Sequence, residues 1–330
     1  MTARRAAARA LANVALVKYF GKRDPLLNLP AAGSLSVALE PLETVTEIAF
    51  DEDLQGDAVS LGGAPADPAF AARTTAFLDI VRGLAGRATF ARVTTRNGFP
   101  TGAGLASSAS GFAALAMAAA EALGVELTEP ELSALARRGS GSAARSIPGG
   151  IAVWMAGTLA DGTDSFARAI AGPRDFDLRI VVGVTDPGPK AVGSTVAMER
   201  TRTTSPYYAS WIETARADLV DAIAAVEARD LERLGEIAER NALAMHGAAL
   251  AARPGLAFWN GATVDALHSI RALRAEGSLA FFTCDAGPQP KALCSPADED
   301  TVAARLAAVP GVRSIIRCRP GAGAALVACP

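Results

Sequence analysis

The sequence predicts an α+β protein of two domains, and three observations support this fold class. The chain has 330 residues, half of them hydrophobic and a fifth charged, a balance typical of a globular protein large enough for two cores. Strand patterns and helix patterns are mixed along its length. Turn residues cluster at 185–190, so we place the domains at 1–186 and 187–330.

The first domain is expected to begin with strands. Residues 1–10 are basic and alanine-rich, and we interpret them as a frayed N-terminus rather than a targeting peptide. The strand that begins at Ala12 ends in the donors Lys18, Tyr19, Lys22 and Arg23, which suit phosphates or a carboxylate but also fit a solvated strand end. Further elements are expected as strands at 34–39, 44–50 and 88–96, a surface hairpin at 51–67 and a helix at 69–84.

A glycine- and serine-rich segment at 99–110 runs directly into an apolar helix at 111–124. Glycines allow the backbone to approach a ligand closely, and serines can cap the helix. The free N–H groups of the first helical turn can bind an anion such as phosphate. The segment is neither a Walker A loop nor a dinucleotide fingerprint, and a capped turn that binds nothing remains the alternative.

A second hydroxyl-rich segment follows a short helix. Thr128 and Glu131 form a capping-box pattern for that helix, which is expected to stop at Gly139. Residues 138–150 read as a flexible loop in which Arg145 could grip a planar anion. Strands are expected at 151–154 and 178–184.

The second domain is predicted as helices on one face of an antiparallel sheet. Ser205, followed by Pro206, is expected to cap its first helix, whose inner face carries Trp211 and Val226. Asp285 follows an apolar strand and precedes a glycine turn, a place that suits a catalytic carboxylate or a turn residue equally well. The remaining elements are expected as helices at 230–250, 262–276 and 300–308 and strands at 279–285, 312–318 and 324–328.

Composition argues against several classes of protein. The formal net charge is −2, which gives no polybasic field for nucleic acid, and no apolar run reaches membrane-spanning length. Four cysteines without C-x-x-C spacing and only two histidines disfavour a zinc site or a disulfide framework and suggest a reducing, cytoplasmic location. Each histidine lies in a helical pattern without a nucleophile elbow nearby, which argues against a Ser-His-Asp hydrolase.

Seven segments, taken together and in order, resemble the GHMP kinase superfamily and, within it, the diphosphomevalonate decarboxylases. The segments that carry the resemblance lie at 12–24, 28–30 together with 34–37, 99–110, 139–146, 204–208, 241–246 and 282–288. The resemblance implies a two-domain fold, with an N-terminal ribosomal-protein-S5-domain-2-like domain and a C-terminal ferredoxin-like α/β sandwich, and an active site in the cleft between them. It also implies a homodimer.

The resemblance further implies an ATP- and Mg²⁺-dependent reaction that converts mevalonate 5-diphosphate to isopentenyl diphosphate, releasing ADP, phosphate and carbon dioxide. Asp285 would face the tertiary hydroxyl, and Lys18 and Arg145 would surround the substrate carboxylate and the transferred phosphoryl group. Substrate-binding residues implied by the resemblance are Asn13, Tyr19, Lys22, Arg73, Ser140, Gly141, Ser142, Thr204 and Ser205. ATP-binding residues implied in the same way are Pro100, Gly102, Ala103, Gly104, Leu105, Ala106, Ser107, Ser108 and Ser110. No protein metal ligand is assigned.

The sequence departs from the family pattern at Phe20, Gly33, Gly98 and Gly102, and Gly33 raises a question about local loop geometry. Three alternatives remain open. One is a decarboxylase of mevalonate 5-phosphate or 3,5-bisphosphate, and a second is a mevalonate 3-kinase that does not decarboxylate. The third is an inactive GHMP-fold binding module, against which the presence of Asp285, Arg145 and Lys18 argues.

Overall fold

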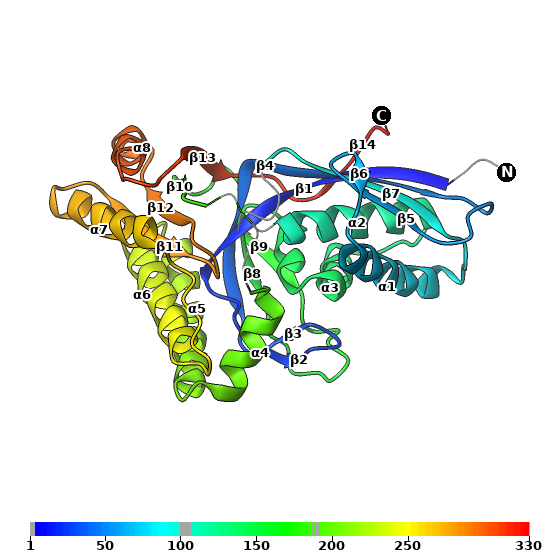
Figure 1. Cartoon of the computed structure of the whole chain (residues 1–330), viewed down its shortest axis with the longest axis horizontal. Helices are drawn as coiled ribbons and strands as arrows, with labels where there is room; N and C mark the ends of the chain where they lie inside the picture. The colour runs from blue at the N-terminus through cyan, green and yellow to red at the C-terminus, as the bar shows by residue number, and fades with distance from the viewer. Residues whose placement is uncertain (1–3, 100–106, 187, 189–191, 330) are drawn as a thin grey trace.

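One mixed sheet of twelve strands runs through the part of the chain that the computed structural model describes, residues 4–99, 107–186, 188 and 192–329 (Figure 1). The longest strand, β4 (Ser34–Phe50), lies at its centre beside β1 (Arg4–Val17). The other strands of this N-terminal part are β5 (Ala58–Leu61), β6 (Ala64–Pro65), β7 (Ala91–Asn97), β8 (Ile151–Trp154), β9 (Ala167–Ala171) and β14 (Ala325–Val327).

The C-terminal part of the sheet joins β4 through a short antiparallel pairing with β13, in which Pro320 lies opposite Leu39. The strands of this part are β10 (Arg179–Val184), β11 (Ala280–Cys284), β12 (Pro290–Cys294) and β13 (Ser314–Pro320). Strand β10 pairs with β12 and β13, although it precedes our boundary at 186, and that boundary stays a prediction. A separate two-stranded ribbon pairs β2 (Lys22–Asp24) with β3 (Leu29–Pro30).

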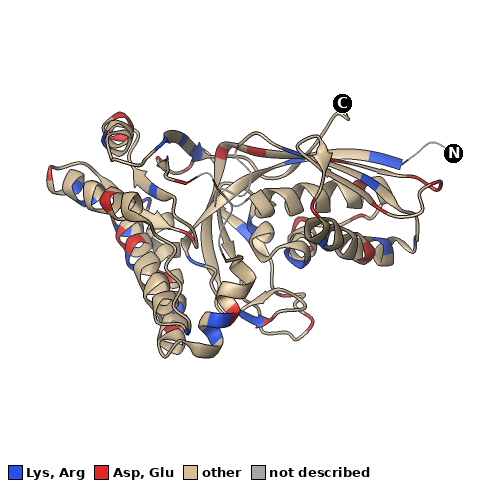
Figure 2. Cartoon of the chain, viewed as in Figure 1, with Lys and Arg blue, Asp and Glu red and all other residues tan. Residues whose placement is uncertain are grey.

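Helices pack against the N-terminal part of the sheet and share one apolar core with it. The helices are α1 (Pro68–Ala85), α2 (Ser107–Leu123) and α3 (Glu129–Gly139), followed by the 3₁₀ helix η1 (Gly141–Ser146). Helix α2 packs against β1 and β4 and is buried for most of its length, and its ribbon is almost free of charged residues (Figure 2). An apolar helix fits this position because it contacts the protein on nearly every side.

The C-terminal part carries the helices α4 (Ser194–Thr204), α5 (Tyr208–Glu227), α6 (Leu231–Leu250), α7 (Gly261–Ala275) and α8 (Glu299–Ala307). Val182 of β10 lies in a core with α5 and α6, whereas its neighbour Val181 lies in a core with α7 and α8. Because successive side chains of a strand point to opposite faces, helices cover both faces of this part of the sheet. The prediction of helices on one face was therefore wrong.

Three further expectations from the sequence were wrong. Residues 4–10 are not frayed but form the first half of β1, where Ala6, Ala8 and Ala10 are buried. The strands expected at 34–39 and 44–50 are the single strand β4. Residues 141–146 of the loop expected at 138–150 form the largely buried helix η1.

Ser205 does not cap a helix by accepting from its first turn. It ends α4, a helix that was not predicted, and its hydroxyl accepts from the backbone N–H of Tyr207 at 3.3 Å. The strands β9 and β12 were missed as well. The Thr128 capping box, the helix expected at 230–250 and the hairpin of β5 and β6 are confirmed. Within the described ranges, no helix is long and apolar enough to cross a membrane.

Candidate active site

A cavity of about 680 Å³ collects residues from both parts of the sheet. The end of β1 supplies Lys18, η1 supplies Arg145, and the segment after β11 supplies Asp285. Met198 of α4 and Met245 of α6 also line the cavity and belong to the C-terminal part of the chain. Other predicted site residues that line it are Asn13, Tyr19, Lys22, Arg73, Ser108, Ser140, Gly141 and Ser142.

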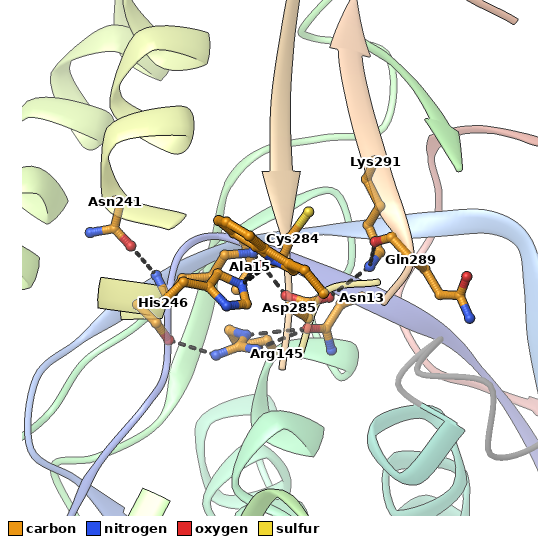
Figure 3. A network of polar contacts seen from close by, with 12 residues as sticks. Asn13, Ala15, Arg145, Asn241, His246, Cys284, Asp285, Gln289 and Lys291 are labelled. Carbon is orange, nitrogen blue, oxygen red and sulfur yellow. Dashed lines mark hydrogen bonds and ion pairs between the residues drawn. The ribbon is translucent and has the colours of Figure 1, made fainter. Parts of the chain in front are cut away.

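Asp285 lies at the centre of a network of polar contacts (Figure 3). Strand β11 is buried throughout and places Asp285 at its carboxyl end, where 24% of the side chain remains exposed. Lys18 Nζ lies 2.8 Å from Oδ1 and Lys291 Nζ lies 3.1 Å from Oδ2. Burial by itself raises the pKa of Asp285, but the two lysine charges outweigh it and hold that pKa well below its usual range. The carboxylate is therefore ionised at neutral pH.

Lys18 is held in place by three contacts. Its side chain is 1% exposed, and Nζ donates to the carbonyl oxygen of Ala15 at 2.7 Å as well as to Asp285. Its backbone N–H donates to Oδ1 of Asn241 on α6 at 2.8 Å. Burial lowers the pKa of Lys18, an effect that Asp285 only partly offsets. The ammonium group thus has a fixed position between the carboxylate and the end of β1.

Arg145 is buried beneath the same cavity. Its Nε and Nη2 donate to Oδ1 of Asn13 at 3.3 and 3.1 Å, and its Nη1 donates to Oγ of Ser34 at 2.7 Å. Its guanidinium lies 5.8 Å from the ring centroid of Trp154. Burial lowers the pKa of Arg145 to about 10, so the group stays charged at neutral pH. It presents a fixed cation to an anionic ligand.

The cavity wall also gathers further donors, and two of them have no partner among the described residues. The hydroxyl of Tyr19 and Nε of Arg138 are buried and have no hydrogen-bond partner among the described residues. Lys22 Nζ lies 2.6 Å from Oδ1 of Asn28, and Ser140 Oγ lies 3.4 Å from Ser142 Oγ. Buried donors without partners are rare, so this set indicates a ligand rich in acceptor oxygens.

Gly141 and Gly33 are required by close packing. A Cβ atom at Gly141 would lie 2.5 Å from the hydroxyl oxygen of Tyr19, inside the cavity wall. At Gly33 a Cβ would lie 2.9 Å from the carbonyl oxygen of Trp154. The departure from the family pattern at Gly33 is thus accommodated by this chain's own packing.

Some predicted residues do not line this cavity. Thr204 ends α4, where Oγ1 donates to the carbonyl oxygen of Arg200 at 2.7 Å, and Ser205 lies in the following turn. Ser110 is buried and contacts Thr44 Oγ1 at 2.6 Å. Pro100, Gly102, Ala103, Gly104, Leu105 and Ala106 lie outside the described residues. Their assigned roles, and that of Ser107, stay predictions.

Sequence reasoning missed several residues that the structure places at the site. Lys291 and Asn241 contact Asp285 and Lys18 from β12 and α6, and Ser34 contacts Arg145. Asn241 and Ser34 lie within segments that carried the resemblance, so their positions were a usable signal. No comparable signal marked Lys291, a single charge inside a short apolar strand.

The fold, with these cations, hydroxyls and one carboxylate around a single cavity, is that of a GHMP-kinase-like protein. A family model described as diphosphomevalonate decarboxylase-like N-terminal domain matches residues 10–167. A second, the mevalonate 5-diphosphate decarboxylase C-terminal domain, matches residues 180–318. The chain therefore belongs to the diphosphomevalonate decarboxylase family.

Individual relatives agree with this assignment. Diphosphomevalonate decarboxylase mvd1 of Aspergillus fumigatus is 35% identical over 94% of this chain and 81% of its own length. Phosphomevalonate decarboxylase of Haloferax volcanii is 33% identical over 82% of each chain. The family thus includes relatives named for a diphosphate and for a monophosphate.

Solved structures agree over nearly the whole chain. Mevalonate diphosphate decarboxylase from Staphylococcus aureus superposes with a TM-score of 0.94, at 35% identity over 99% of both chains. A structure in complex with MVAPP, AMPPCP and magnesium superposes with a TM-score of 0.92, at 37% identity over 99% of both chains. The predicted α+β, two-domain GHMP-kinase-like fold is confirmed.

Proposed function

We propose that this protein decarboxylates mevalonate 5-diphosphate in an ATP- and Mg²⁺-dependent reaction, yielding isopentenyl diphosphate, ADP, phosphate and carbon dioxide. The observation that carries the proposal is the ionised carboxylate of Asp285, held between Lys18 and Lys291 at the wall of a cavity that Arg145 and Ser108 also line. One acid, a fixed guanidinium and a serine at a helix N-terminus suit phosphorylation followed by loss of a carboxylate.

Asp285 is proposed to face the tertiary hydroxyl of the substrate. Its ionised oxygens accept the hydrogen bond of that hydroxyl and orient it toward the nucleotide's terminal phosphate. As the new O–P bond forms and the P–O bond to ADP breaks, the hydroxyl proton passes to an oxygen of the transferred phosphoryl group. After phosphorylation the carbon–oxygen bond breaks, phosphate leaves, and positive charge develops on the tertiary carbon. The same carboxylate stabilises that charge electrostatically. The bond between the carboxylate carbon and its neighbouring carbon then breaks, and carbon dioxide leaves. The electrons of that bond form the new double bond to the tertiary carbon.

Arg145 is proposed to align the substrate carboxylate for this last step. Its contacts with Asn13 and Ser34 fix the guanidinium, so the carboxylate is oriented at little entropic cost. Tyr19, Lys22 and Ser140 line the cavity and suit the diphosphate, because its oxygens supply the acceptors that the buried Tyr19 hydroxyl lacks.

Mg²⁺ prefers hard oxygen ligands and usually keeps several waters while it bridges phosphate oxygens. Ser108 lines the cavity at the first turn of α2, and a hydroxyl oxygen at that position fits such an ion. When bound, the ion neutralises charge on the nucleotide phosphates. The neighbouring segment at 100–106 is proposed to hold the same phosphates, as the resemblance implies.

A substrate panel tests the proposed function. Mevalonate, its 5-phosphate, its 3,5-bisphosphate and its 5-diphosphate are each supplied with ATP and Mg²⁺, and carbon dioxide, ADP and product identity are measured. Carbon dioxide from the 5-diphosphate alone supports the proposal. Carbon dioxide from the 5-phosphate or the 3,5-bisphosphate favours the alternative decarboxylase. The panel includes the 5-phosphate because the Haloferax relative is named phosphomevalonate decarboxylase. A 3-phosphorylated product without carbon dioxide indicates a kinase, and no ATP use with any substrate indicates an inactive module.

A pair of neighbouring variants tests the diphosphate end of the cavity. Lys22→Met removes a cation that lines the cavity and should raise the KM for the diphosphate substrate. Arg23→Met is the control, because that exposed guanidinium donates to the carbonyl oxygen of Leu159 at 3.0 Å and does not line the cavity. Equal KM values for the two variants would contradict the assignment of Lys22.

We also propose a cytoplasmic location and a homodimeric state. The four cysteines are free thiols, which suits a reducing compartment. Light scattering of the purified protein tests the homodimer, and cell fractionation tests the location.

A further inference from the structure

Lys291 is a buried cation at the candidate active site that does not line the cavity. It lies in β12, in which all five residues are buried, and is itself 2% exposed. Its Nζ atom lies 3.1 Å from Oδ2 of Asp285 and 3.4 Å from the carbonyl oxygen of Gln289. Figure 3 shows its side chain running down from β12 toward Asp285. A residue in this position acts on the carboxylate rather than on a ligand.

The register of the β11–β12 hairpin places the two residues together. Thr283 pairs with Lys291 across the hairpin. Residues two apart along a strand point to the same face, and Asp285 is two residues beyond Thr283. Lys291 and Asp285 are therefore diagonal neighbours on one face, close enough for a long side chain to bridge.

Burying a lysine is unfavourable unless an opposite charge and hydrogen bonds compensate it. Among the described residues, the ion pairs of Lys291 involve a single acid, Asp285. Lys18 takes one oxygen of that carboxylate and Lys291 takes the other. Two fixed contacts on opposite oxygens define the plane of the carboxylate, so it cannot rotate freely about its Cβ–Cγ bond.

We propose that Lys291 is a positioning residue, which fixes the orientation of the Asp285 carboxylate and keeps it ionised throughout the reaction. This inference rests on the proposed function of Asp285. The other titratable groups that face Asp285 are Lys18 from the end of β1, Arg145 from η1, His246 from α6 and Cys284 from β11. Burial lowers the pKa of His246 to about 3 and raises that of Cys284 to about 11, so both are neutral at pH 7. The charges that hold Asp285 ionised therefore come from Lys18 and Lys291.

The variant Lys291→Met tests this role, because methionine keeps much of the apolar length and removes the charge. With one cation removed, the pKa of Asp285 rises, so the acid limb of the kcat profile should move to higher pH by about one unit or more. We expect kcat at pH 7 to fall about tenfold or more, with KM values for substrate and ATP near those of the wild type. An equal rise in KM and fall in kcat would point to general distortion and overturn the role.

Arg179→Met is the matched control. Arg179 lies in the adjacent strand β10, and its Nε lies 3.3 Å from Oε2 of Glu299, so the variant removes a cation from the same sheet without touching Asp285. Its pH profile should superpose on that of the wild type. If Lys291→Met does not fold, Lys291→Gln takes its place with the same expectations.

A direct titration separates this inference from the proposed function. Protein labelled with ¹³C at the aspartate carboxyls is titrated by NMR, and the Asp285 signal is the one absent from Asp285→Asn. Its midpoint should be at least one pH unit higher in Lys291→Met than in the wild type. An unchanged midpoint overturns the role of Lys291, even if Asp285→Asn is inactive. A raised midpoint together with an active Asp285→Asn enzyme instead overturns the catalytic role of Asp285.

Discussion

Lys18 and Asp285, 267 positions apart in the sequence, are joined by a contact of 2.8 Å between Nζ and Oδ1. The first belongs to the end of β1 and the second to the end of β11, so the candidate site forms only where the two parts of the sheet meet. Asp285 also lines the same cavity as Ser108, which lies at the start of the serine-rich helix α2.

Replacing Asp285 by asparagine should abolish most turnover. The variant keeps the shape of the side chain but removes the charge that orients the hydroxyl and stabilises the developing cation, so we expect kcat to fall by roughly 10²–10⁴-fold. Affinity for an ATP analogue should stay near that of the wild type. Asp265→Asn, an exposed position on α7, is the control. An Asp285→Asn enzyme with normal kcat would refute the catalytic role.

Asn13 should be important for both stability and activity, because its amide accepts from Arg145 and donates to Ser146 Oγ at 2.8 Å. Asn13→Ala leaves a buried guanidinium short of an acceptor, so the free energy of unfolding should fall by about 2–4 kcal/mol. Ser34→Ala removes one bond to the same guanidinium and should lower it by only about 1–2 kcal/mol. Urea unfolding measures both, and a larger effect at Ser34 would contradict this ranking.

Stability should fall in mild acid because of His246. Burial is the main cause that lowers its pKa to about 3, followed by the charge of Lys18, and Trp259 Nε1 donates to its Nε2 at 3.2 Å. The unfolded state, with a histidine pKa near 6.5, binds more protons between about pH 3 and 6.5, so stability is complete above that window and is lost as pH falls through it.

This contribution should lower the free energy of unfolding by about 2 kcal/mol between pH 7 and pH 5. His246→Gln should remove it, which urea unfolding at the two pH values would reveal as a smaller difference than in the wild type. His268→Gln tests specificity, because the chain has only these two histidines and His268 is exposed. Identical pH dependence in the wild type and His246→Gln would exclude His246 as the cause.

Asp57 should anchor the N-terminal core. Its side chain is 1% exposed, forms an ion pair with Arg82 of α1, and accepts from the backbone N–H of Ala91 at 2.8 Å. Asp57→Ala leaves Arg82 without its buried partner, so the free energy of unfolding should fall by about 3–5 kcal/mol. Asp79 also pairs with Arg82 but is 64% exposed, and Asp79→Ala should cost less than about 1 kcal/mol. Similar losses in the two variants, measured by urea unfolding, would show that burial of the pair does not matter.

The three main groups of the candidate site were accessible from sequence through the family resemblance. Asp285, Lys18 and Arg145 lie in segments that carry it, and each lines the cavity. Taken alone, the positions of Asp285 and Lys18 fitted a turn residue and a solvated strand end as well. The Thr128 cap was predictable for a local reason, since its side chain bonds to a backbone N–H group three residues away.

The rest depended on pairing between distant segments. Alanine has a low intrinsic preference for strands, so residues 4–10 gave no strand signal, yet they pair with β4 throughout and with β14 at Ala7, Ala8 and Arg9. Lys291 reads as a solvent-facing charge until the hairpin register places it beside Asp285. Helix α4 was missed because few apolar residues mark its sequence, and only three of its residues are buried.

The strand β4 pairs with β7 and β8 of the N-terminal part and with β13 of the C-terminal part, while the late strand β14 returns to β1. If the two parts were expressed as separate proteins, the backbone N–H and C=O groups that now pair between them would be left unpaired in both. Each product would then expose an open sheet edge. We expect the two parts to melt as one cooperative unit and to resist being shuffled separately into other proteins during evolution.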